Sequence, residues 1–155
     1  MLQLKLEEIV KEAAQGKRQK TAQQEAKELL IELKEGRQIK IGRLSEKTNM
    51  SKLSETALTG VYLHECEGTM VFLYINDRTV SFNQGRFRFN DDGTLVYYNE
   101  CIHGTYVIPA GSGELLLIPQ APKGEYKLVK SGDQFLLGFP QARYGQKFKA
   151  TVIEI

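Results

Sequence analysis

Clusters of turn-forming residues recur at short intervals after residue 57, and they constrain the fold more than any other feature. The clusters are rich in Asn, Asp, Gly and Pro, the residue types that tight turns favour. Short runs of Val, Ile, Leu, Tyr and Phe lie between them, and several runs alternate apolar with polar residues. The pattern predicts strands near residues 59–65, 69–75, 79–82, 86–90, 94–99, 104–108, 114–118, 125–129, 134–139 and 147–154.

Short connections between successive strands favour antiparallel neighbours. A sheet of this size avoids exposed edges by closing on itself. We therefore expect residues 57–155 to form an antiparallel, mainly up-and-down β-barrel or sandwich of eight to ten strands.

The first third of the chain has a different composition, because all Tyr and Phe lie at or after Tyr62 and all Pro at or after Pro109. Residues 1–35 carry two apolar stripes with helical spacing, separated near Gly16. They predict two helices or one bent helix, followed by a polar linker over 36–56 with room for one short helix. The expected class is therefore α+β. The stripes are Leu2, Leu6, Ile9, Val10 and Ala13, then Ala22, Ala26, Leu29, Leu30 and Leu33.

Residues 60–139 resemble the small bacterial lipocalin-like barrels. The similar segments are Gly60-Val61-Tyr62, Phe87 to Thr94, Gly104 to Ile108, Glu114 to Leu117, Tyr126-Lys127-Leu128 and Gly132 to Leu136. The resemblance implies an up-and-down barrel whose interior is either filled or holds a small apolar ligand. It implies no catalysis.

All histidines and cysteines of the protein fall in two short pairs, His64-x-Cys66 and Cys101-x-His103. Residues two apart on a strand point to the same face, so two adjacent strands would bring four zinc-type ligands together. The sequence therefore offers a zinc site at His64, Cys66, Cys101 and His103. The alternatives are two buried cysteines with unrelated strand-end histidines, or a Cys66–Cys101 disulfide.

The segment 38–58 resembles the helix-turn-helix of winged-helix regulators, with Asn49 at the turn. A recognition helix beginning near Ser51 would present its polar side chains to the DNA major groove. The nucleic-acid contacts expected from this hypothesis are Lys47, Ser51, Lys52 and Ser54. The alternative is a polar linker with one short helical turn.

The sequence favours a non-enzymatic module for ligand or protein binding, because it carries no nucleophile elbow and no Asp or Glu that is evidently placed to orient either histidine. The N-terminal helices would dock a protein partner or a second copy of the chain. A nucleic-acid-binding regulator and a zinc-binding protein are the two alternatives. No apolar run is long enough to cross a membrane, and no signal peptide is evident, so the expected location is the cytoplasm.

Overall fold

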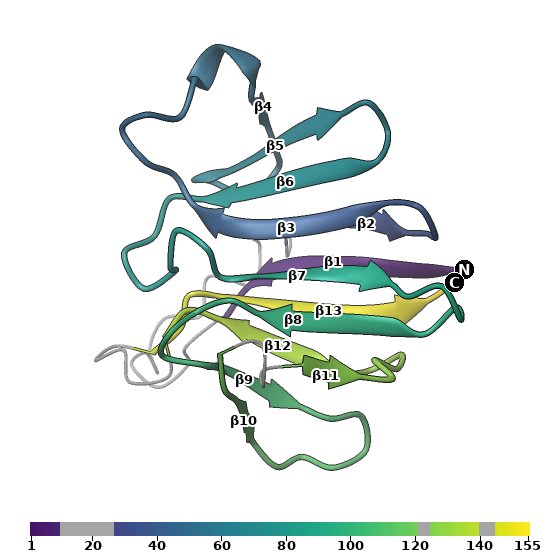
Figure 1. Ribbon diagram of the computed structural model, residues 1–155. Coiled ribbons are helices and arrows are strands. Elements are labelled where there is room, and N and C mark those ends of the chain that lie inside the picture. The colour runs from purple at the N-terminus through teal and green to yellow at the C-terminus, as the bar shows by residue number, and fades with distance from the viewer. Residues whose placement is uncertain (10–26, 121–124, 140–144) are drawn as a thin grey trace.

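Two β-sheets form almost all of the regular structure in the computed structural model, which describes residues 1–9, 27–120, 125–139 and 145–155 (Figure 1). The first sheet has the order β10 (Leu116–Ile118), β9 (Thr105–Ile108), β12 (Gln134–Leu137), β13 (Phe148–Glu154), β1 (Leu2–Glu8) and β2 (Glu28–Leu33). The second has the order β11 (Glu125–Lys127), β8 (Leu95–Asn99), β7 (Gly85–Phe89), β3 (Gln38–Arg43), β6 (Met70–Ile75), β5 (Val61–Cys66) and β4 (Ser54–Glu55).

The predicted N-terminal helical segment is wrong, because the described parts of residues 1–35 form strands β1 and β2. Leu2 and Leu6 fit a helical period and a strand period equally well. Leu4 decides between them, since it is fully buried and lies on the same face as Leu6. β1 pairs along its length with the C-terminal strand β13. The predicted features at residues 10–26 lie outside the described residues.

The predicted closed barrel is also wrong, because the strands form two separate sheets with open edges at β10, β2, β11 and β4. The chain changes sheet between β2 and β3, between β8 and β9, between β10 and β11, and between β11 and β12. The predicted up-and-down order is interrupted because β3 lies between β6 and β7, pairing in parallel with β6 and antiparallel with β7. Each sheet therefore contains strands from distant parts of the sequence.

The strands predicted after residue 57 all overlap an observed strand, with the exception of 79–82. That stretch is a turn in which the carboxylate of Asp77 accepts hydrogen bonds from the amide and hydroxyl of Thr79. The helical content of the described residues is a single 3₁₀ turn, η3 (Met50–Lys52). None of the described helical structure has the length and hydropathy that a membrane span requires.

The two sheets share one apolar core, and its centre is aromatic. The Phe135 ring from the first sheet lies 4.9 Å from Phe87 and 4.8 Å from Tyr97 of the second sheet, measured between ring centroids. All three side chains are fully buried. Because the contact joins one sheet to the other, it stabilises the pairing of the layers as well as each layer alone.

We expect Phe135→Ala to lower the free energy of unfolding by about 3–5 kcal/mol, because it leaves a cavity between the sheets. Phe82→Ala removes the same side chain from a position that is 53% exposed, so it is the matched control and should change stability by less than about 1 kcal/mol. Urea unfolding of both variants measures the difference. Equal losses would show that Phe135 does not join the layers.

Candidate functional site

A hollow of about 380 Å³ lies where several inter-strand loops meet. Its walls come from the end of β3, the β6–β7 loop and the β8–β9 loop, with single residues following β10 and β12. We call it the loop pocket, and its lining residues are Arg43, Arg78, Val80, Ser81, Phe82, Asn83, Glu100, Cys101, Ile102, His103, Gln120 and Phe139.

Two arginines supply the charge of the loop pocket. The Nη1 of Arg43 donates to the carbonyl of Arg78 at 3.0 Å, and its guanidinium lies 4.1 Å from the centre of the Phe82 ring. These contacts hold Arg43 in place without neutralising it. No carboxylate of the described residues forms an ion pair with Arg43 or Arg78.

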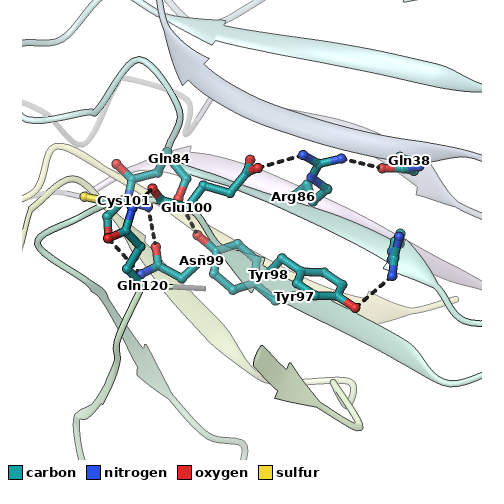
Figure 2. Close-up of polar contacts among 10 residues, drawn as sticks. Gln38, Gln84, Arg86, Tyr97, Tyr98, Asn99, Glu100, Cys101 and Gln120 are labelled. Atoms are coloured by element: carbon teal, nitrogen blue, oxygen red, sulfur yellow. Dashed lines mark hydrogen bonds and ion pairs between the residues drawn. The ribbon is translucent and has the colours of Figure 1, made fainter. Parts of the chain in front are cut away.

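Glu100 also lines the loop pocket, but its charge is balanced. Its Oε2 accepts a hydrogen bond from the Nη2 of Arg86 at 2.6 Å, and the Nη1 of Arg86 donates to Gln38. Figure 2 shows Arg86 lying between these two side chains. The Glu100–Arg86 pair adds no net charge, so the two remaining arginines leave the pocket positive.

A buried polar network contacts two residues that line the loop pocket, Ser81 and Cys101, and we call it the pocket floor. Figure 2 shows the part of this network around Asn99 and Cys101. The side-chain amide of Asn99 donates to the carbonyls of Cys101, Ile118 and Pro119, and its oxygen accepts from the Thr105 hydroxyl at 2.7 Å. Asn99 therefore ties the β8–β9 loop to the end of β10. Because these groups are buried, each needs its partner.

Gln84 continues this network into the β6–β7 loop. Its Nε2 donates to the Thr105 hydroxyl, and its Oε1 accepts from the amide of Ser81. The Tyr97 hydroxyl approaches the same Thr105 oxygen at 3.2 Å. Burial raises the pKa of Tyr97 far above that of an exposed tyrosine, so this hydroxyl stays protonated and remains a donor. Tyr97 thus joins the aromatic core to the pocket floor.

Two glycines leave the room that this arrangement needs. A Cβ at Gly42 would lie 2.1 Å from the carbonyl oxygen of Phe82, so only glycine allows the β6–β7 loop to lie against β3. A Cβ at Gly85 would lie 2.2 Å from the Tyr97 hydroxyl oxygen. The pocket therefore depends on backbone contacts that a larger residue would block.

The structure does not bring the four proposed zinc ligands together. His64 and Cys66 lie on β5, whereas Cys101 and His103 follow β8, and three strands separate β5 from β8 in the sheet. Both cysteines are free, and no cluster of three metal-ligating side chains occurs in the described part of the chain. Cys101 and His103 line the loop pocket, whereas His64 stacks on Phe72.

The segment 38–58 does not contain the two helices of a helix-turn-helix. It consists of β3, the short turn η3, strand β4 and connecting residues. Asn49 caps η3 by accepting a hydrogen bond from the amide of Ser51. The four predicted nucleic-acid contacts are exposed in this stretch, but no recognition helix presents them: Lys47, Ser51, Lys52 and Ser54.

Comparisons with protein-family models, curated proteins and solved structures gave no match.

We expect Asn99→Ala to destabilise the protein by about 2–4 kcal/mol, because it removes the buried acceptor of the Thr105 hydroxyl proton and the side-chain donor to three loop carbonyls. Asn83→Ala is the matched control, since Asn83 is exposed on the same pocket and should change stability by less than about 0.5 kcal/mol. Urea unfolding tests both. A small loss for Asn99→Ala would mean that the network does not hold the loops.

Proposed function

We propose that this protein is a non-enzymatic binding module whose loop pocket takes an anionic group carried by a protein partner. The observation that carries the proposal is the pair of arginines, Arg43 and Arg78, that line the pocket. Among the described lining residues the one carboxylate is that of Glu100, and it is already paired with Arg86. Guanidinium groups suit phosphate and carboxylate oxygens because they offer several donors in a fixed plane. Ser81, Asn83 and Gln120 add neutral polar groups around the same space.

A binding role fits the other polar groups of the pocket better than catalysis does. The thiol of Cys101 is buried and lies 3.0 Å from the Ser81 hydroxyl. His103 packs against the Phe139 ring, and no hydrogen bond within the described residues joins it to either of these groups. A nucleophile needs a base within hydrogen-bonding reach, and this pocket provides donors and cations instead.

Apolar side chains at the pocket favour an anion that belongs to a peptide or protein. Phe82 is 53% exposed and Ile102 is 72% exposed, and both line the pocket. Exposed apolar side chains beside positive charges can contact the apolar residues of a peptide whose anionic group binds the arginines. We place the protein in the cytoplasm, which fits two cysteines that remain unpaired.

The first test is titration of the full chain with inorganic phosphate, followed through the backbone amides of residues 81–83 and 101–103 by NMR. Arg43→Gln and Arg78→Gln should each weaken saturable binding roughly tenfold, because each removes charge-assisted hydrogen bonds. Lys52→Gln removes a cation that does not line the pocket and should leave the affinity unchanged. Unaltered binding by both arginine variants would contradict the proposal.

The second arm of the test asks whether the anion belongs to a peptide. Phosphorylated and acidic peptides with an apolar residue beside the anionic group should bind more tightly than free phosphate. Ile102→Ala should weaken peptide binding while leaving phosphate binding unchanged, because Ile102 lines the pocket and has no contact with either arginine among those described. Peptides that bind no better than free phosphate would show that the pocket serves a small anion instead.

A further inference from the structure

A second hollow, of about 280 Å³, lies at the opposite end of β3 from the loop pocket. It is formed by the β2–β3 turn, the start of β6 and the end of β7. We call it the turn pocket, and its lining residues are Gly36, Arg37, Gln38, Thr69, Met70, Arg88 and Phe89. It shares no lining residue with the loop pocket.

Two guanidinium groups line the turn pocket, and no acidic side chain does so among the described residues. Arg88 is fixed from one side, because its Nη2 donates to the Tyr98 hydroxyl at 2.7 Å and its guanidinium lies 4.5 Å from the centre of that ring. Both contacts leave its positive charge uncompensated. Two like charges around one hollow favour a bound anion.

The strongest indication of an anion site comes from the Nε atoms of the two arginines. The Nε of Arg37 and the Nε of Arg88 are both shielded from solvent and have no hydrogen-bond partner. Buried N–H groups are almost always paired, and a bound ion is one of the partners that satisfy such a group. Both of these unpaired Nε–H donors belong to arginines that line the turn pocket.

We propose that the turn pocket is a second anion site, which binds an oxyanion such as phosphate or carboxylate through Arg37 and Arg88. Arginine binds oxyanions in a paired geometry, in which Nε and one Nη of the same guanidinium donate to one anion. The Thr69 hydroxyl is a further donor at the same space. This site is separate from the loop pocket, and its binding of an anion does not require the function proposed for that pocket.

The test uses the full chain and two probes, inorganic phosphate and acetate, with the arginine Nε–Hε signals followed by NMR. Arg37→Lys and Arg88→Lys assign the two signals, because each substitution removes one of them. We expect saturable shifts of both signals, together with the amides of Gly36 and Thr69. The probe that binds more tightly identifies the preferred oxyanion.

Arg37→Gln should weaken this binding roughly tenfold, whereas Arg43→Gln should leave it unchanged because Arg43 lines the other pocket. Melting temperatures confirm that each variant is folded, and Arg37→Lys provides a charged replacement if Arg37→Gln does not fold. Signals that fail to saturate with either probe, or binding that survives the loss of Arg37, would overturn the proposal. Loss of binding in Arg43→Gln alone would assign the anion to the loop pocket instead.

Discussion

The contact of Phe135 with Phe87 and Tyr97 is the interaction on which the rest of the structure depends. It joins the two sheets at the centre of the core, where all three rings are fully buried. Tyr97 also reaches beyond the core, because its hydroxyl meets the Thr105 oxygen in the floor of the loop pocket. The same residue therefore fixes the distance between the layers and supports the loops that position Arg43 and Arg78.

The strands after residue 57 could be predicted because alternation and turn chemistry are local signals, which one sequence contains in full. The N-terminal strands could not be separated from helices in the same way. Leu2 and Leu6 satisfy both periods, and Leu29 and Leu33 repeat the ambiguity. The structure resolves it through pairing: β1 lies between β13 and β2, a non-local contact that composition does not reveal. The insertion of β3 between β6 and β7 interrupts the predicted up-and-down order for the same reason.

The candidate site was less predictable than the strands. The sequence predicts metal binding at Cys101 and His103, and the structure places both at the loop pocket, away from the expected partner ligands on β5. Arg43 and Arg78 are ordinary surface residues in the sequence, since only the parallel pairing of β3 with β6 brings them together. Asn99 gives no sequence signal either, because a buried asparagine looks like a turn residue until its partners are known.

The aromatic contact makes the two sheets a single cooperative unit. Native-state hydrogen exchange of the central strands is the sharpest test of this coupling, with β7 reporting on one sheet and β12 on the other. We expect the slowest amides of both strands to exchange with the same opening free energy, equal to that of global unfolding. Amides of one strand that open at a clearly lower free energy would show that the sheets unfold separately and that the contact does not couple them.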